Sequence, residues 1–489
     1  MNKEKSSCKF RKSKSKSRPT DYIQSNNRFT RAKNKKLTST LRNSVSSEKD
    51  LSEIINIENR CSLLKTSNSI NDDFELMVKH YKEEFLDNPK YSFITNNIRN
   101  PPDIPLLIKI YRKVVKNGGF KQVTANWQWD KISSSKDKDS STEIFDLYKK
   151  HLFHYEKLFN EATALKLNYK TDGVTIEDLD PNYLVPVKVY EINTPEDLTE
   201  SMIKDALKQD IWVFRNFQKA TDLNKKIFEP DYLSRTHGQE SVDVLNQDPE
   251  VKTFHRTPHI RNQQKLQTYI NYQKKEKVKD ESGRISFAVN IDIGNWEAHI
   301  NELVSKIPDE FLFCSRMDTL QYVRRHILGM SQPQLYIKVK GAWTGGHEEN
   351  LRFRAANLNH GPAPSEWNAV GSKDSSRLRN EVRDIYDVDI YKKEGLWFSD
   401  TDFCLAKKIP VVWFNQREGD FVILGPGCQH WVRSFGKAVQ SAWNFGSFDE
   451  WQIKETIKRM DVNNNIVYKV SISTVIFSQS FPTGHSCWT

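Results

Sequence analysis

The segment QLYIKVKGAWTGGHEENLRFRAANLN, residues 334–359, determines how the second half of this chain is interpreted. At its centre, His347 and Glu349 are separated by a single residue. Side chains two positions apart project from the same face of a β-strand, so both can reach one ion while Glu348 points away. On a helix the same two positions diverge by about 200° around the axis. The pair is therefore a candidate metal site only if this segment is extended.

A third candidate ligand, His430, lies much further along the chain. It follows an apolar run of period two and the turn Gly425-Pro426-Gly427, as expected for a ligand on a strand. Two imidazoles and one carboxylate form the facial triad of non-haem Fe(II) oxygenases, which leaves metal positions open for substrate and O₂. A second His-x-Glu triplet, at 154–156, lies in a segment with helical apolar spacing, so its His and Glu side chains are not expected to bind one ion.

The positive charge of the chain is concentrated near its N-terminus. The 489 residues carry a net charge of +11, and the first 45 residues are dominated by Lys, Arg, Ser and Asn. Such a segment cannot bury enough apolar surface to order itself, so residues 1–70 are predicted to be a disordered basic tail. Its basic runs at 10–18 and 31–36 are typical of nuclear-import signals or nucleic-acid contacts, with a solubilising tail as the alternative. We expect a nuclear protein.

Cysteine usage and hydropathy exclude several classes of protein. The six cysteines are scattered without a Cys-x-x-Cys pair, which indicates reduced intracellular thiols and argues against a zinc module built from cysteines. No apolar run approaches the roughly 20 residues of a membrane span. The basic N-terminus also lacks the apolar core of a secretory signal. We therefore expect no membrane association.

Helical apolar spacing organises residues 71–165, which are predicted to form a compact all-α domain. Apolar residues recur every three to four positions from Phe74 to Phe85, from Ile104 to Val115 and from Ile144 to Tyr155. The pair Gly118-Gly119 is a helix stop signal after the second of these segments.

This domain resembles an ARID DNA-binding domain in the order of its motifs: a helix, Lys116-Asn117-Gly118-Gly119-Phe120, Trp129, Ile132, Tyr148 and Tyr155. The resemblance implies a module related to the helix-turn-helix that lays a loop and a helix into the DNA major groove. The chain departs from the family at SSSKDKDSS, residues 133–141, where a loop containing glycine is usual. The candidate phosphate contacts, which would make binding salt-sensitive, are Lys131, Lys136, Lys138, Lys149 and Lys150. A helical domain with a merely solvated charged face is the alternative.

Residues 166–185 form an acidic stretch that we interpret as a linker. The following region mixes helical and short β-like runs up to residue 333 and is mostly β-like from 334 onward. Many short strands punctuated by Gly and Pro are typical of a β-sandwich or jelly roll, whose mouth would suit a triad carried on strands. The expected strands are 335–339, 355–358, 365–370, 411–414, 420–424, 430–432 and 439–445.

Residues 186–467 contain ordered blocks that are similar to the JmjC domain of UTX-type demethylases, which act on lysine 27 of histone H3. The blocks are Ile327–Met330, Gln334–Val339, Thr344–Asn350, Asn357 with Asn359, Glu366-Trp367, Pro410–Val412, Gly419-Asp420, His430–Val432 and Ala442–Asn444. The resemblance implies a multidomain α + β chain whose JmjC domain, at 186–448, is a double-stranded β-helix of the jelly-roll, cupin-like type. It also implies an Fe(II)- and 2-oxoglutarate-dependent dioxygenase that oxidises N-methyl groups of the methylated H3 tail and releases formaldehyde.

The same resemblance assigns two sets of residues: His347, Glu349 and His430 for Fe(II), and Lys338, Thr344 and Asn357 for 2-oxoglutarate. A dicarboxylate in a cavity needs a cation, and a lysine inside a barrel would otherwise be an unpaired buried charge. Taken alone, Lys338 would be an exposed lysine on a strand. Two positions depart from the family: Ala355 replaces a small residue able to hydrogen-bond the cosubstrate, and Gln440 stands where Asn is common.

Residues 449–489 are expected to form a C-terminal helix and an atypical tail. UTX-type enzymes carry a four-cysteine zinc domain after JmjC, whereas only Cys487 stands here, and residues 470–489 are interpreted as a read-through tail. Three functions remain open: a histone demethylase working with chromatin subunits and contacting DNA through the ARID-like domain and the basic tail, an inactive chromatin- or DNA-binding protein, and a JmjC protein hydroxylase. The first is preferred because an inactive relative has no need for the triad and the lysine.

Overall fold

A computed structural model describes residues 72–459 of the chain with short gaps. The longest gaps are 134–140, 162–177 and 250–259 apart from Phe254. The predicted basic tail, the candidate DNA contacts Lys136 and Lys138, and the predicted read-through tail therefore lie outside the described residues. The described residues from Phe74 onward belong to one compact unit. Within the described part of the chain, no helix has both the length and the apolar character needed to cross a membrane.

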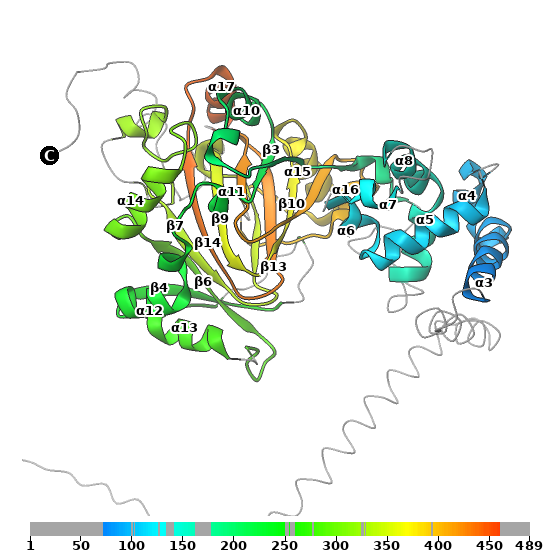
Figure 1. Cartoon of the computed structure of the whole chain (residues 1–489), viewed down its shortest axis with the longest axis horizontal. Coiled ribbons are helices and arrows are strands. Elements are labelled where there is room, and N and C mark those ends of the chain that lie inside the picture. The colour runs from blue at the N-terminus through cyan, green and yellow to red at the C-terminus, as the bar shows by residue number, and fades with distance from the viewer. Residues whose placement is uncertain are drawn as a thin grey trace, which may run out of the picture. The chain divides into compact units, whose positions relative to one another are not determined.

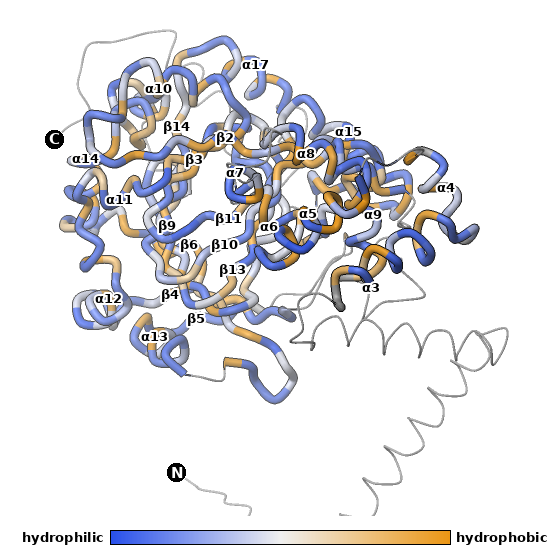
Figure 2. The backbone as a smooth tube through the Cα atoms, turned by 45° about the vertical axis from the view of Figure 1, so that its right-hand side comes forward, coloured by the Kyte–Doolittle hydropathy of each residue, from blue (hydrophilic) through white to orange (hydrophobic). Residues whose placement is uncertain are grey.

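The N-terminal domain is helical, as predicted (Figure 1). Its elements are α3 (Asp72–His80), η1 (Tyr81–Leu86), η2 (Pro89–Tyr91), α4 (Ser92–Thr95), η3 (Asn96–Ile98), α5 (Ile104–Lys116), α6 (Gly119–Ala125), α7 (Trp129–Ile132), α8 (Ser141–His151), α9 (Phe153–Glu156) and η4 (Lys157–Glu161). Figure 2 shows hydrophobic and hydrophilic residues alternating along these helices, as expected for helices that bury one face. Aromatic side chains, among them Tyr81, Phe85, Tyr148 and Tyr155, fill the interior.

Glycine marks the junction between α5 and α6. Gly118 and Gly119 have φ angles of +96° and +87°, a backbone region that residues with a Cβ rarely adopt. The backbone N–H of Phe120 then donates to the Glu156 carboxylate at 2.9 Å, and the Tyr148 hydroxyl donates to the same group. The triplet at 154–156 lies in α9 and is helical, as predicted. The Glu156 carboxylate caps the start of α6.

The second half forms two β-sheets, which confirms the jelly-roll prediction (Figure 1). The five-stranded sheet has the order β1-β11-β10-β13-β8, and the nine-stranded sheet has the order β2-β3-β12-β9-β14-β7-β6-β4-β5. The strands are β1 (Leu184–Val185), β2 (Lys188–Glu191), β3 (Ile211–Arg215), β4 (Ser241–Gln247), β5 (Ile260–Lys265), β6 (Ile285–Asp292), β7 (Gln334–Lys338), β8 (Trp343–His347), β9 (Arg354–Pro362), β10 (Ser365–Val370), β11 (Val411–Gln416), β12 (Phe421–Leu424), β13 (Gln429–Ser434) and β14 (Ala438–Phe445).

Helices surround these sheets. They are α10 (Glu200–Ala206), α11 (Phe217–Ala220), α12 (Pro230–His237), α13 (Leu266–Lys274), α14 (Glu297–Lys306), α15 (Ser372–Tyr386), α16 (Thr401–Ala406) and α17 (Glu450–Lys458), with short turns η6 (Pro181–Tyr183), η7 (Pro195–Asp197), η8 (Lys225–Phe228), η9 (Thr319–Tyr322) and η10 (Asn350–Arg352). All seven strands expected between 335 and 445 are present, with ends that shift by a few residues.

Two features differ from the expectation. The region after residue 334 was expected to be mostly strands, yet α15 and α16 lie between β10 and β11. Their polar and charged surface residues weaken the apolar periodicity on which the prediction depends. The end of the predicted linker, at Leu184 and Val185, is also not a linker, since it pairs in parallel with Val411 and Val412 of β11.

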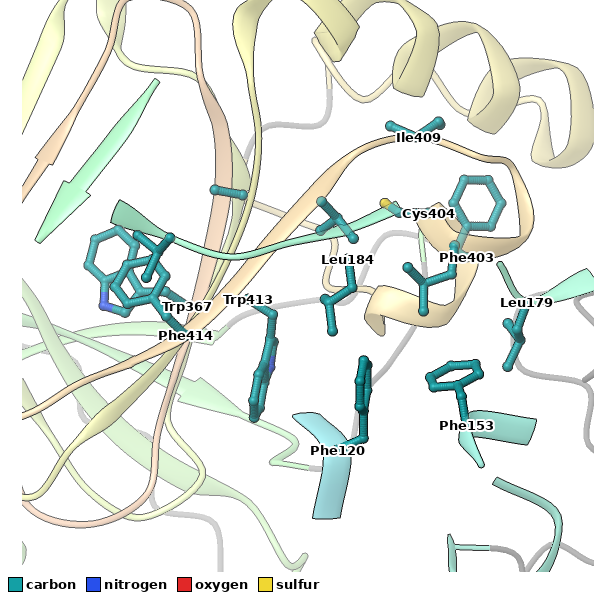
Figure 3. Close-up of a cluster of buried hydrophobic side chains, with 14 of the residues drawn as sticks. Phe120, Phe153, Leu179, Leu184, Trp367, Phe403, Cys404, Ile409, Trp413 and Phe414 are labelled. Carbon is teal, nitrogen blue, oxygen red and sulfur yellow. The ribbon is translucent and has the colours of Figure 1, made fainter. Parts of the chain in front are cut away.

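The helical domain and the jelly roll share one buried core (Figure 3). Phe120 and Phe153 of the helical domain belong to the same apolar cluster as Leu184, Phe403 and Trp413 of the jelly roll. Helix α6 packs against β11. This shared core fills the space between the two domains with side chains of both.

Ion pairs, one of them buried, join the two domains as well. The Lys157 ammonium lies 3.2 Å from the Asp402 carboxylate, and both side chains are 3% exposed. Lys121 of α6 lies 3.0 Å from Asp400 and 3.3 Å from Asp402. Two lysines of the helical domain therefore converge on the start of α16.

Candidate metal centre

The end of β8 carries two of the three predicted metal ligands. His347 is the last residue of β8, a strand absent from the expected set, whereas Glu349 lies two residues beyond the end of the strand. Glu349 has φ −65° and ψ 151°, so the backbone remains extended after the hydrogen-bonded strand ends. The two side chains share one face, and Glu348 turns to the opposite face, where it is buried.

Strand β13 carries the third predicted ligand. His430 is the register partner of His347, and the two ring centroids lie 4.2 Å apart. One carboxylate oxygen of Glu349 lies 3.8 Å from Nε2 of His347 and 3.6 Å from Nε2 of His430. The three ligand atoms all lie within 4.8 Å of one another, which is the convergence that the sequence interpretation requires.

Backbone carbonyls orient both imidazoles. Nδ1 of His347 lies 2.8 Å from the Gly345 carbonyl oxygen, and Nδ1 of His430 lies 3.3 Å from that of Cys428. A carbonyl only accepts, so each Nδ1 carries the proton and each Nε2 lone pair faces the centre, as in protein metal sites. Burial, reinforced by His347, also holds the pKa of His430 well below its usual value and keeps that ring neutral. The donor set fits a divalent metal ion such as Fe(II).

Trp367 is a residue of the site that the sequence interpretation did not single out for a role. It lies on β10, and its ring is stacked on the His430 ring at 14° with centroids 5.7 Å apart. Its indole N–H donates to the side-chain oxygen of Gln416 at 2.9 Å. The indole thereby fixes the plane of the His430 imidazole. Only its place in the Glu366-Trp367 block of the sequence pointed to it.

The predicted cosubstrate residues line the same pocket as the predicted metal ligands. This pocket, whose volume is about 440 Å³ including its open mouth, is lined by Lys338, Thr344 and Asn357 together with the triad. The structure therefore brings together all six residues that were predicted for metal and cosubstrate. Residues of β7, β8, β9 and β13 meet there because the strands close around one interior.

Lys338 places a cation in the interior of this pocket. Its side chain is 2% exposed, and burial lowers its pKa to about 7. The ammonium lies 5.5 Å from the centre of the Phe287 ring, and no carboxylate of the described residues forms an ion pair with it. A buried charge without a partner costs free energy, so this site favours an anionic ligand.

Amide side chains surround Asn357. Gln416 donates from Nε2 to Oδ1 of Asn357 at 3.0 Å, and Gln440 donates to Oε1 of Gln416 at 2.7 Å. Oε1 of Gln440 is buried without a hydrogen-bond partner among the described residues. Both positions that depart from the family pattern, Ala355 and Gln440, line the pocket. Gln416 was missed because a neutral amide on a strand carries no sequence signal of its own.

The lysines predicted to contact DNA differ in whether their ammonium groups already have contacts within the helical domain. Lys131 and Lys150 are exposed on α7 and α8. Lys149 instead lies 3.1 Å from the Asp146 carboxylate and 4.6 Å from the centre of the Phe145 ring. Its ammonium is therefore already engaged within the helical domain.

The fold and the site define a chain with two known domain types. Residues 334–445 match the family model described as "JmjC domain, hydroxylase", and residues 85–156 match that of the "ARID/BRIGHT DNA binding domain". The chain therefore combines an ARID domain with a JmjC domain whose core is a jelly roll.

Two curated relatives resemble parts of the chain. Lysine-specific demethylase 6B of Homo sapiens is 36% identical over 182 residues, which cover 37% of this chain and 11% of the human protein. Lysine-specific demethylase jmjd-3.1 of Caenorhabditis elegans is 24% identical over 356 residues, covering 62% of this chain and 33% of that protein. The chain thus spans a third or less of either relative.

Proposed function

We propose that this protein is an Fe(II)- and 2-oxoglutarate-dependent histone lysine demethylase. The proposal is carried by one observation: the ligand atoms of His347, Glu349 and His430 converge within 4.8 Å in the pocket that also contains the buried Lys338. It is supported by the JmjC match and by two relatives named as lysine-specific demethylases. The substrate proposed is the methylated histone H3 tail at lysine 27, on the basis of the UTX-like sequence blocks.

Iron held by the triad would supply the oxidation of an N-methyl group, with O₂ and 2-oxoglutarate consumed and succinate, CO₂ and formaldehyde released. The side chains of the pocket would bind and orient the metal ion and the cosubstrate. The Lys338 ammonium would neutralise the distal carboxylate of 2-oxoglutarate, and Thr344 and Asn357 would donate hydrogen bonds to the cosubstrate. The carbonyls of Gly345 and Cys428 accept from Nδ1 of the two imidazoles, which leaves each Nε2 lone pair free to bind the iron.

The test is incubation of the purified full chain with trimethylated H3 lysine-27 peptide, Fe(II), ascorbate and 2-oxoglutarate, followed by mass spectrometry. We expect stepwise losses of one methylene, absent in a His347→Ala variant. A gain of one oxygen would identify a hydroxylase instead. An unchanged peptide mass, with an active demethylase alongside, would favour a non-catalytic chromatin protein. Peptides methylated at other H3 lysines, run in parallel, test the choice of lysine.

We further propose that the ARID domain contacts DNA and that the protein acts in the nucleus, where its histone substrate is found. The ARID match and the exposed lysines Lys131 and Lys150 support this proposal. Each phosphate contact makes the slope of log affinity against log salt concentration more negative by about one. Fluorescence anisotropy of duplex DNA should therefore show a shallower slope for Lys131→Ala and for Lys150→Ala. Slopes identical to that of the unmodified chain would contradict phosphate contact by these residues.

A further inference from the structure

A buried polar cluster lies behind the metal centre. Glu348, between the ligands His347 and Glu349, has a fully buried carboxylate. Arg352 donates to it twice, from Nε at 2.8 Å and from Nη2 at 2.7 Å, and the Ser375 hydroxyl of α15 donates as well. Two parallel bonds from one guanidinium fix the position and the plane of a carboxylate. The residue that links the two neighbouring ligands is therefore held rigidly.

Helix α17 supplies the far side of the same cluster. The third donor of Arg352, Nη1, lies 2.7 Å from Oε2 of Glu455, whose side chain is 5% exposed. Arg459, just after the end of α17, donates to the Glu348 carboxylate at 3.3 Å. The cluster thus connects the end of β8 to a helix that lies outside the region matched to the JmjC domain.

The loop that leads to the third ligand packs on this cluster too. Gly427 has φ +72°, and a Cβ added there would lie 3.1 Å from both Nε of Arg352 and Oε2 of Glu455. At Gly425 an added Cβ would lie 2.7 Å from the ring of Trp451, also on α17. His430 follows three residues after Gly427, so the approach to this ligand is set by close contact with the cluster and with α17.

The backbone at Arg352 is itself constrained. Leu351 and Arg352 have φ angles of +54° and +57°, in the left-handed region that non-glycine residues seldom occupy. Such a conformation persists only where surrounding contacts hold it. The hydrogen bonds from Arg352 to Glu348 and Glu455 are those contacts, and the turn they hold directly follows Glu349.

We propose that Glu348, Arg352 and Glu455 are positioning residues of the metal centre, and that helix α17 is thereby part of the metal-binding unit. This inference rests on the proposed function, since it takes the triad to bind a metal ion. Through Glu348 the cluster fixes His347 and Glu349, and through Gly427 it fixes the loop before His430. Partners that orient metal ligands typically change metal affinity about 10- to 100-fold when they are substituted.

A purely structural role is the competing explanation, because many buried ion pairs affect only stability. The chain offers a matched control in the Lys157–Asp402 pair, which is equally buried but joins the helical domain to α16. Lys157→Met should lower stability without touching the metal centre.

The test uses the full chain and Co(II) as a spectroscopic probe, with no turnover required. Co(II) affinity is measured by calorimetry and its visible absorption recorded for the unmodified chain, Glu455→Gln, Glu348→Gln and Lys157→Met. Glu455→Gln keeps the shape of the side chain while removing its charge. We expect both glutamate variants to lose about tenfold or more in Co(II) affinity and to change the absorption spectrum. Lys157→Met should match the unmodified chain in both.

The outcomes separate this inference from the proposed function. Co(II) binding by the unmodified chain, with equal affinity and spectrum in both glutamate variants, overturns the positioning role alone. Failure of the unmodified chain to bind Co(II) overturns the metal centre and the inference with it. If a glutamate variant does not fold, Ser375→Ala, which removes only one hydroxyl bonded to Glu348, carries the same test, and an unchanged affinity there overturns the proposal.

Discussion

His347 and His430 face each other as register partners across β8 and β13, with ring centroids 4.2 Å apart. The register of this strand pair shifts between His430 and Val432. Such irregularities re-aim side chains, and they are frequent beside active sites. Two of the predicted ligands, His347 and Glu349, are close in sequence, whereas closure of the jelly roll brings the His430 imidazole next to them.

Lys338→Met should raise the stability of the ligand-free protein and abolish its binding of 2-oxoglutarate. The buried ammonium costs free energy in the empty pocket, so a methionine of similar length should raise the melting temperature of the ligand-free protein by a few degrees. The same change should abolish 2-oxoglutarate binding, measured by calorimetry. Lys340→Met is the control, since Lys340 is exposed just beyond the end of the same strand. A Lys338→Met protein that still binds 2-oxoglutarate normally would contradict the role of this lysine.

The pH dependence of cosubstrate binding should follow the protonation state of Lys338. Its pKa is lowered from 10.5 to about 7 in the empty pocket, and a bound dicarboxylate favours the charged form. Above pH 7 binding should therefore take up a proton, and affinity should fall by up to about tenfold per pH unit. Calorimetry at pH 8 in two buffers of different ionisation heat measures that uptake. Equal heats in both buffers would argue against it.

The same lowered pKa sets how stability depends on pH. Between pH 7 and 10.5 the unfolded lysine binds a proton that the folded one does not. The contribution of Lys338 should therefore make the empty protein more stable as pH rises through this window. Urea unfolding across the window, with Lys338→Met as the reference, measures it. A difference between the two proteins that does not change with pH would rule this contribution out.

The ion pair between domains should be destabilising when only one partner is removed. Asp402→Ala removes the carboxylate that lies 3.2 Å from the buried Lys157 ammonium, which should lower the free energy of unfolding by about 3–5 kcal/mol. The double change Lys157→Met with Asp402→Leu should recover most of the loss, because both buried charges of the pair are removed and Lys121 keeps its contact with Asp400. Urea denaturation of the single and double variants measures both values. A loss below about 1 kcal/mol for Asp402→Ala would show that solvent reaches the pair.

Gln416 should influence the cosubstrate through Asn357. Gln416→Leu removes the donor to Oδ1 of Asn357, so the amide can rotate away from the orientation needed for the cosubstrate. We expect the affinity for 2-oxoglutarate to fall about tenfold, near the value of one hydrogen bond to a charged group. Co(II) affinity should fall less, because Gln416 reaches the triad only through the Trp367 indole that stacks on His430. A parallel loss of Co(II) affinity would indicate a general disturbance of the pocket.

Parts of the site were predictable because the physics that forms them is local. Strand periodicity alone indicated that His347 and Glu349 share a face and that Glu348 points away, and the structure confirms this. The short apolar runs around Gly and Pro likewise predicted the strands. Sequence blocks shared with a known family then supplied Lys338, Thr344 and Asn357, which a single strand pattern does not single out.

The remaining features depend on contacts between distant segments. Nothing near Glu348 in the sequence indicates that Arg459 will contact it or that Glu455 will contact the nearby Arg352, in each case from more than 100 residues away. Lys157 and Asp402 find each other only because the helical domain packs on α16. Buried charges such as these look like ordinary surface residues until the fold is known.

The most direct test of the central claim is X-ray absorption spectroscopy at the iron edge, on protein loaded with Fe(II) without oxygen. We expect the scattering of two imidazole rings and of light oxygen ligands, with one imidazole lost in His430→Ala. Sulfur scattering, no imidazole, or an unchanged count in that variant would contradict a centre built from His347, Glu349 and His430.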